Sequence, residues 1–166
     1  MRAAMIALLA LVAFSPVARA APHFGFTAPL GTYNKATLRA GFAVYQANCA
    51  ACHGISAVRA RDLAGLGVSR AAMARWRALR PTQQPAAPDL SLIATALPQG
   101  AASIVSLLRV HHPPKSAVMA HDVAEFLAWS ADPTLDQRKS IMLRAMIYLA
   151  IFGLIGFFAL RQDRTP

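Results

Sequence analysis

Five consecutive residues, Cys49-Ala50-Ala51-Cys52-His53, form the pattern C-x-x-C-H. This pattern is typical of covalent haem attachment of the c type. Two thiols at this spacing can form thioether bonds to the two vinyl groups on one edge of a haem. The histidine that follows can then bind the iron from one side. The sequence therefore predicts one covalently bound haem c with its iron, held by Cys49 and Cys52, with His53 as the proximal iron ligand.

Three other kinds of site also use closely spaced cysteines. A thioredoxin-like C-x-x-C site requires a surrounding βαβ pattern, which is missing here. A zinc site needs about four nitrogen or sulfur ligands, and the motif with a distant histidine could only just supply them, because no second pair of ligands follows. A disulfide between Cys49 and Cys52 would close a very short loop and stabilise the fold little. Haem attachment is the favoured interpretation.

The sixth position of the iron decides what such a haem can do. An open position binds small ligands, and a thioether raises the reduction potential relative to a second imidazole. We expect His112 or Met119 to supply this ligand, with His111 as a weaker candidate. Met73 and His121 are less favoured, since a methionine inside a helix more often fills a core. The simple alternative for the histidine pair is two solvent-facing imidazoles in a loop.

The segments around the haem motif and the candidate sixth ligands show the spacing of apolar residues that is typical of helices, and no strand alternation is evident. Asn34 is expected to cap a helix whose apolar positions lead directly into Cys49. A second helix is predicted at 70–79, after a short segment at 59–66 that glycines interrupt. Short apolar helices or turns are predicted at 90–97 and 103–110. The sequence His111-His112-Pro113-Pro114 cannot continue a helix, and a final amphipathic helix should run from about Ser116 to the break at Asp132-Pro133. The fold class is therefore all-α: a c-type cytochrome haem domain with a single C-terminal transmembrane helix.

The two ends of the chain predict export and anchoring. Residues 1–20 combine a positive start, an apolar run of about ten residues and an A-x-A site, which is typical of a cleaved signal peptide and too short for a membrane span. Residues 139–161 are apolar enough to span a bilayer in contact with membrane lipid, with Arg144 reaching the interface. Residues 21–138 would be the exported haem domain and 162–166 a cytoplasmic tail. This arrangement predicts a bacterial inner-membrane protein with its haem domain in the periplasm and its C-terminus in the cytoplasm.

Basic residues outnumber acidic ones, and the chain has a formal net charge of +10. Much of the excess in the exported domain comes from one group of arginines: Arg70, Arg75, Arg77 and Arg80. Export argues against nucleic acid as a partner. The arginines are expected to form a solvated helix face or, as the sharper hypothesis, a docking patch for an acidic partner.

Taken in order along the chain, these features resemble the cytochrome c1 family, the anchored haem subunits of cytochrome bc complexes (ubiquinol–cytochrome c reductases). The resemblance covers nearly the whole mature chain, from the arm and first helix at 24–45 through the haem motif. It continues with Arg61-Asp62-Leu63, Pro88-Asp89-Leu90-Ser91-Leu92-Ile93, the stretch 122–129, Asp132-Pro133, Arg138-Lys139 and the terminal anchor. The family's loops after the haem motif and before the last helix are largely missing, so this chain resembles a shortened member.

The resemblance implies electron transfer from an iron–sulfur subunit, in a complex with cytochrome b, to a soluble or anchored cytochrome acceptor. Three departures bear on the site. The family's sixth ligand is a methionine followed closely by prolines, whereas here His112 precedes Pro113-Pro114. The family's arginine that pairs with a haem propionate corresponds to Leu97, so Arg109 or another basic residue would have to replace it. Many relatives present an acidic surface to a basic cytochrome c, whereas this domain is mildly basic.

Two other functions remain open. A stand-alone or duplicate anchored electron carrier of another redox chain is favoured by the shortened loops. A haem-based ligand binder or sensor requires an exchangeable sixth position. The chain shows no nucleophile–base pair or other catalytic constellation, so any enzyme activity would belong to an oxidoreductase complex of which it is the electron-transfer subunit.

Overall fold

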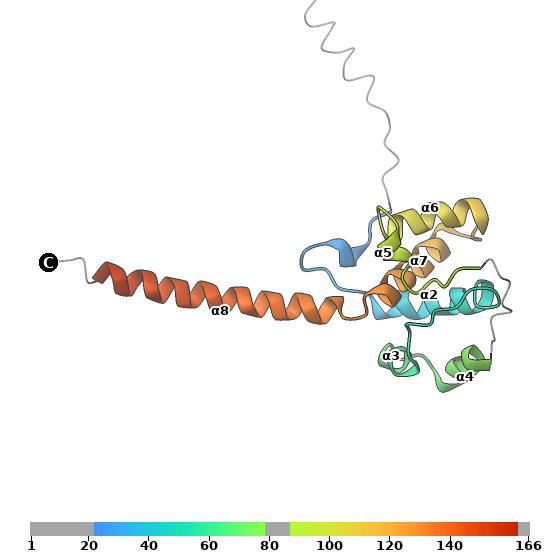
Figure 1. Ribbon diagram of the computed structural model, residues 1–166, viewed down its shortest axis with the longest axis horizontal. Coiled ribbons are helices and arrows are strands. Elements are labelled where there is room, and N and C mark those ends of the chain that lie inside the picture. The colour runs from blue at the N-terminus through green and yellow to red at the C-terminus, as the bar shows by residue number, and fades with distance from the viewer. Residues whose placement is uncertain (1–21, 79–86, 163–166) are drawn as a thin grey trace, which may run out of the picture.

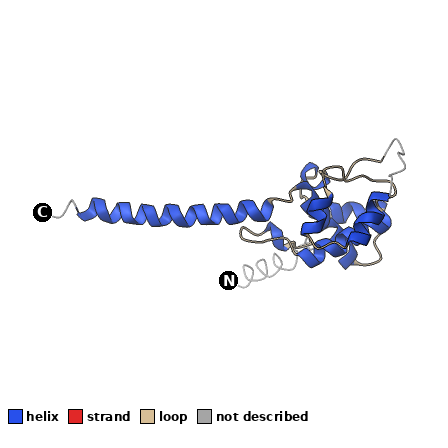
Figure 2. Ribbon diagram, turned by 90° about the horizontal axis from the view of Figure 1, so that it is seen from below, coloured by secondary structure: helices blue, strands red, loops and turns tan. Residues whose placement is uncertain are grey.

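The computed structural model describes residues 22–78 and 87–162, and within these residues the chain forms helices and loops without a strand (Figures 1 and 2). The all-α prediction is confirmed for this part. The elements are a 3-10 turn η1 (Gly25–Thr27) and the helices α2 (Lys35–Asn48), α3 (Ala60–Gly65), α4 (Arg70–Ala78), α5 (Ile93–Ala96), α6 (Ala101–His111), α7 (Ala117–Ala131) and α8 (Leu135–Gln162). The predicted signal peptide at 1–20, Arg80 and residues 163–166 of the predicted tail lie outside the described residues.

Helices α2 and α7 form the centre of the haem domain, and their contact is the most extensive between any two described helices. Each has a side-chain N-cap, because Asn34 Oδ1 accepts from Ala36 N and Ser116 Oγ accepts from Met119 N. The apolar face of α2 packs Phe42 edge-on against Phe126 of α7, with ring centroids 5.6 Å apart. The Asn34 cap and the apolar faces of both helices are the local signals that predicted them.

The remaining short helices cover this pair. Helices α5 and α6 pack on α7, and α4 packs on α2 through an edge-on contact between Trp76 and Phe42. Helix α6 continues through His111, so the prediction that no helix could include this residue was wrong. A proline restricts the backbone of the residue before it, which is His112 here, and leaves His111 free to stay helical.

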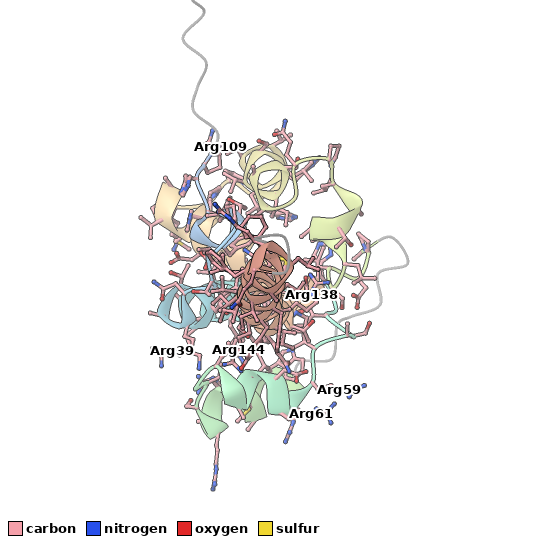
Figure 3. All side chains as sticks on the ribbon, turned by 90° about the vertical axis from the view of Figure 1, so that its left-hand side faces the viewer. Arg39, Arg59, Arg61, Arg109, Arg138 and Arg144 are labelled. Atoms are coloured by element: carbon pink, nitrogen blue, oxygen red, sulfur yellow. The ribbon has the colours of Figure 1, made fainter. Side chains whose placement is uncertain are left out.

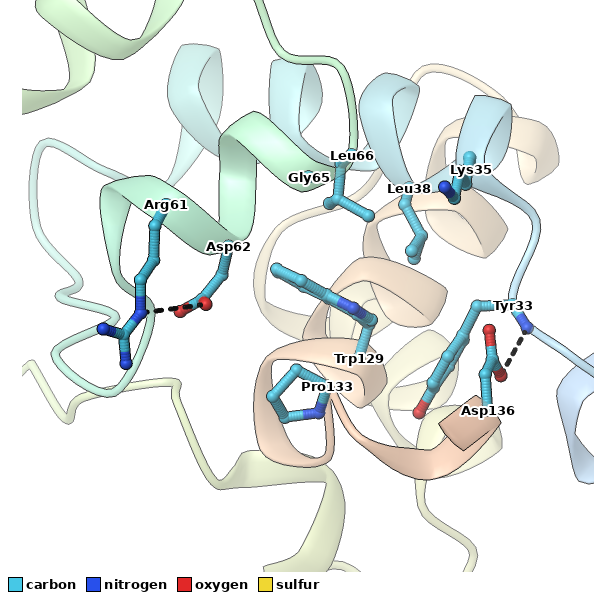
Figure 4. A pocket seen from close by; sticks show the side chains of 10 residues that line it. All are labelled: Tyr33, Lys35, Leu38, Arg61, Asp62, Gly65, Leu66, Trp129, Pro133 and Asp136. Atoms are coloured by element: carbon cyan, nitrogen blue, oxygen red, sulfur yellow. Dashed lines mark hydrogen bonds and ion pairs between the residues drawn. The ribbon is translucent and has the colours of Figure 1, made fainter. Parts of the chain in front are cut away.

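The junction between the haem domain and α8 is held by polar contacts, of which Figure 4 shows the one between Tyr33 and Asp136. Asp136 in the first turn of α8 accepts from the backbone N–H of Tyr33 at 3.1 Å, and Arg138 pairs with Asp132 at the end of α7. The Lys139 ammonium donates to three carbonyl oxygens of the N-terminal arm, those of residues 26, 28 and 31, at 2.6–2.8 Å. The first turn of α8 is therefore part of the domain surface, and the helix starts four residues before the predicted anchor.

Beyond this junction α8 projects away from the haem domain as a single straight rod (Figure 1). Its 28 residues give a length of about 42 Å, which exceeds the roughly 30 Å of a bilayer's hydrocarbon core. It is the one helix in the described part of the chain that is long and apolar enough to cross a membrane, and none of its apolar stretch is buried. The predicted C-terminal transmembrane helix fits this element.

Replacing Gly41 by alanine is expected to destabilise the haem domain. A Cβ at this position would lie 2.1 Å from the carbonyl oxygen of Asp122 and 2.7 Å from the Cβ of Phe126, so α2 and α7 would have to separate. Such overpacking costs about 1–3 kcal/mol or more. Thermal unfolding of the detergent-solubilised full chain measures the loss. The matched control is Gly65→Ala, which meets nothing within 4 Å and should be neutral or slightly stabilising.

Candidate haem site

The C-x-x-C-H motif forms one helical turn directly after α2. The backbone N–H groups of Cys52 and His53 both donate to the carbonyl oxygen of Cys49, at 3.0 and 2.9 Å. Ala50 is buried in the core at 2% exposure, Cys49 is half-buried and Cys52 is exposed. The turn therefore fixes the two thiols and the histidine on one short piece of backbone and keeps both thiols accessible.

A loop that is distant in sequence orients the imidazole of His53. Nδ1 lies 2.8 Å from the carbonyl oxygen of Pro88. A carbonyl can only accept a hydrogen bond, so Nδ1 donates the proton. In the neutral imidazole this leaves the lone pair on Nε2, which is the nitrogen that can then bind a metal. The hydrogen bond thus selects both the tautomer and the direction of the ring.

The same loop is attached along its length to the segment that follows the motif. Leu90 N–H donates to the carbonyl of Gly54 at 2.8 Å, and the N–H of Ser56 donates to Asp89 Oδ2 at 2.9 Å. A Cβ on Gly54 would lie 2.9 Å from that carboxylate oxygen, so glycine permits the close approach. Burial would raise the pKa of Asp89, but hydrogen bonds from Ser91 and Ser56 outweigh it and lower the pKa, so the carboxylate stays charged and the loop stays attached.

An apolar cavity of about 460 Å³ lies beside His53, and His112 lies across it. The two imidazole centroids are 6.2 Å apart and the rings are perpendicular. Transition metals bind imidazole nitrogen at about 2 Å, which places two imidazoles on opposite sides of one metal with centroids about 6 Å apart. The separation and the apolar walls both fit a haem. The cavity is lined by Cys49, His53, Pro88, Leu90, Ile93, Ile104, Leu107, Leu108, His111, His112 and Leu127.

The other candidate ligands lie in different places. Met119 lines an adjoining cavity of about 250 Å³ together with His112, and His111 is exposed on the wall of the larger cavity. Met73 packs against the core from α4, as a core-filling methionine would. His121 stacks on Phe24 of the N-terminal arm, with ring centroids 4.5 Å apart.

The thiols do not have the features of a redox or zinc site. Burial, with a smaller effect from Cys52, raises the pKa of the Cys49 thiol, whereas a reactive C-x-x-C thiol needs a lowered pKa. Over residues 22–78 and 87–162, no group of three or more His, Cys, Asp or Glu side chains is placed to hold a metal ion. A haem needs only two protein ligands, because its porphyrin supplies the others.

Two positions that the sequence did not identify contribute to the site. Pro88 belongs to a stretch that resembled the family pattern, but nothing local indicated that its carbonyl would meet His53. The Tyr45 hydroxyl donates to the backbone carbonyl of His53 at 2.6 Å, although its helical spacing indicated only a core residue. Arg109 is exposed on α6 and does not line the larger cavity, so the structure gives no support for it as a propionate partner.

Comparison with known proteins matches this chain to the description "Cytochrome C1 family" over residues 24–84 and 111–165, well over half of its length. The chain belongs to the cytochrome c1 family. It is 26% identical over 221 positions to "Cytochrome b-c1 complex catalytic subunit, mitochondrial" of Candida albicans, with 87% of this chain and 76% of that protein covered. It is 27% identical to "Cytochrome c1, heme protein, mitochondrial" of Kluyveromyces lactis over 82% of this chain and 73% of the relative. "Cytochrome c1-2, heme protein, mitochondrial" of Solanum tuberosum is 24% identical, with 78% of each covered.

This family member is shorter than its relatives, as the sequence indicated. The first alignment spans 221 positions, more than the 166 residues of this chain, so the relative carries residues that are missing here. The family match omits residues 85–110. That segment contains Pro88, α5 and nearly all of α6, and it supplies much of the wall of the larger cavity. Much of the cavity wall beside the haem motif is therefore built by residues outside the family match.

Replacing Tyr45 by phenylalanine should destabilise the domain by about 1–2 kcal/mol at pH 7, because the His53 carbonyl loses its buried donor. Burial raises the pKa of Tyr45 above its ordinary 10.0. This contribution is complete below pH 10 and is lost as pH rises from there through the folded pKa, because the unfolded tyrosine ionises first. The difference in melting temperature between wild type and Y45F should therefore narrow above about pH 10. Tyr148→Phe, at an exposed position on α8, is the control. It should change neither the stability at pH 7 nor the dependence of the melting temperature on pH.

Proposed function

We propose that this protein is a membrane-anchored c-type cytochrome that carries electrons as the cytochrome c1 subunit of a ubiquinol–cytochrome c reductase. Family membership supports respiratory electron transport and haem as the cofactor. The observation that carries the proposal is the arrangement around His53: its Nδ1 is held by the Pro88 carbonyl, and its ring faces His112 across an apolar cavity.

In this proposal Cys49 and Cys52 hold the haem covalently, His53 is the proximal ligand and His112 is the sixth ligand. Haem supplies reversible one-electron transfer when it is bound. The residues of the chain bind and orient it. The Pro88 carbonyl keeps the proton on Nδ1 of His53, and the leucine and isoleucine side chains of the cavity exclude water and so favour a low local dielectric constant.

The partners follow from the family and from α8. The haem domain, residues 21–138, would accept an electron from an iron–sulfur subunit beside cytochrome b and pass it to a soluble or anchored cytochrome. We place the anchor, residues 139–161, in a bacterial inner membrane, with the domain on the periplasmic side after removal of residues 1–20 and with 162–166 in the cytoplasm. The contacts of Lys139 and Asp136 support a fixed position of the domain above the membrane.

A stand-alone carrier of another redox chain is the second candidate. Two observations favour it: residues 85–110 lie outside the family match, and a histidine stands before Pro113-Pro114. Purification of the tagged full chain from its native membrane distinguishes the two candidates. Stoichiometric recovery of a cytochrome b and an iron–sulfur protein supports the bc-type complex, and recovery of the haem protein without them supports the separate carrier.

The double variant Cys49→Ala/Cys52→Ala should lose covalently attached haem. Each thioether needs one of these sulfurs, and the described part of the chain has no other cysteine. Haem staining after denaturing electrophoresis measures the attachment. Each single variant should retain haem through one bond, and its reduced α-band should shift because one vinyl group stays unsaturated. A stained band of normal intensity from the double variant would contradict the assignment.

Two single variants identify the sixth ligand. We expect the wild type to give a bis-imidazole spectrum without a methionine–iron charge-transfer band, and to bind no carbon monoxide when reduced. His112→Ala should open the site, so that the reduced protein binds carbon monoxide and the potential shifts, whereas Met119→Ala should leave the spectrum unchanged. If Met119→Ala opened the site and His112→Ala left the spectrum unchanged, Met119 would be the sixth ligand. Carbon monoxide binding by the wild type would favour a ligand binder or sensor.

A further inference from the structure

The acidic side chains of the haem domain are committed to contacts within the domain. Six of the chain's seven carboxylates lie in the described residues, since only Asp163 falls outside them. Five accept a hydrogen bond from a backbone amide or an arginine, and Asp122 faces His121 Nδ1 at 3.6 Å. The five are Asp62 with Arg59 N, Asp89 with Ser56 N and Ser91 N, Glu125 with Asn34 N, Asp132 with Arg138, and Asp136 with Tyr33 N.

Three of these carboxylates lie at the α8 end of the domain. Asp132 and Asp136 lie at the α8 junction, and Glu125 binds the start of α2 near the same end. Asp89 is the one described carboxylate that lines a cavity beside the motif, and its two oxygens accept from backbone amides. The end of the domain that carries the motif thus presents little free negative charge.

Free basic side chains flank the motif on two sides. Arg77 of α4 lines a cavity of about 320 Å³ with Ala50 and Gly54, and Lys115 lines the 250 Å³ cavity with Cys49 and His112. Arg77 and Lys115 are exposed, and neither forms an ion pair with a described residue. Arg70 and Arg75 of α4 and Arg109 of α6 are likewise exposed. Figure 3 shows Arg109 projecting outward from the domain.

Exposed apolar side chains lie close to His112 along the chain. Cys52 and His112 are exposed, and Leu107, Val110 and Val118, which lie within six residues of His112 in the sequence, have exposed fractions of 38%, 75% and 67%. Figure 1 places the C-terminal ends of α2 and α6 at the side of the domain opposite α8. A membrane that contains α8 would therefore leave this side accessible to a soluble partner. An apolar centre with a charged rim is the usual form of a transient redox interface.

We infer that this surface, centred on Cys52 and His112 and rimmed by Arg77 and Lys115, docks a redox protein whose own contact surface is acidic. The inference rests on the electron-carrier function proposed above and adds the charge of the partner. An acidic partner would be steered to the haem edge by complementary potential, whereas a lysine-rich cytochrome would be repelled. Because the attraction acts between exposed charges, salt should weaken it strongly.

Stopped-flow electron transfer tests the inference with a matched pair of acceptors. The reduced full chain in lipid nanodiscs is mixed with a lysine-rich soluble cytochrome c, or with the same cytochrome after succinylation of its surface lysines, at rising ionic strength. We expect the succinylated acceptor to react at least about tenfold faster at low salt, with a rate that falls as salt rises. The native acceptor should react more slowly, and its rate should stay constant or increase as the salt concentration rises.

Charge reversal locates the surface. Arg77→Glu/Lys115→Glu should lower the rate with the succinylated acceptor about tenfold at low salt and leave the haem spectrum unchanged. The control, Lys35→Glu/Arg61→Glu, makes the same change in net charge beside Asp136 at the α8 junction and should have a much smaller effect. The docking inference alone would be overturned if the native acceptor reacted faster than the succinylated one with a rate that falls as salt rises. Equal effects of the two double variants on the rate would overturn it as well. Transfer to neither acceptor at any salt concentration would overturn the carrier function as well.

Discussion

The hydrogen bond between His53 Nδ1 and the Pro88 carbonyl is the contact on which the rest of the site depends. The C-x-x-C-H turn fixes where the histidine backbone lies, but a free imidazole could still rotate and change tautomer. The Pro88 carbonyl, on a loop that is hydrogen-bonded to Gly54 and Ser56, prevents both the rotation of the ring and the change of tautomer. The His112 ring lies 6.2 Å from the His53 ring, centroid to centroid, and both rings line the apolar cavity, so the position of the imidazole is set by the fold itself. Such preorganisation suits electron transfer, in which the surroundings of the metal should change little between oxidation states.

A second set of contacts connects this site to the membrane helix. The domain is not attached to α8 by a loose linker, because Lys139 donates to three carbonyls of the arm and Asp136 receives the Tyr33 amide. The arm in turn leads into α2, and the haem motif follows directly after α2. A continuous path of hydrogen bonds and helix therefore fixes the height of the site above the start of the anchor, which matters because electron transfer depends steeply on the distance between partners.

The same internal contacts determine which charged side chains remain free at the surface. The carboxylates serve as hydrogen-bond acceptors that hold loops and junctions, while the basic side chains, with few acidic partners, remain in solvent. The segment 85–110, which the family match omits, brings Arg109 to the surface and builds the wall of the cavity. Residues outside the family match thus contribute both to the lining of the site and to the charge around it.

Local patterns in the sequence determined the haem motif, the all-α class, the cap at Asn34 and the apolar C-terminal helix. Each of these depends on residues within a few positions of one another, where spacing alone sets the geometry. Tertiary structure decided what joins residues far apart in the chain. Pro88 meets His53 from 35 positions away, and His112, rather than Met119, faces that ring because α6 packs beside α7. Lys139, which the sequence indicated only as the start of the anchor, binds an arm more than 100 positions away. Such contacts depend on how loops and helices dock, and no local periodicity encodes that docking.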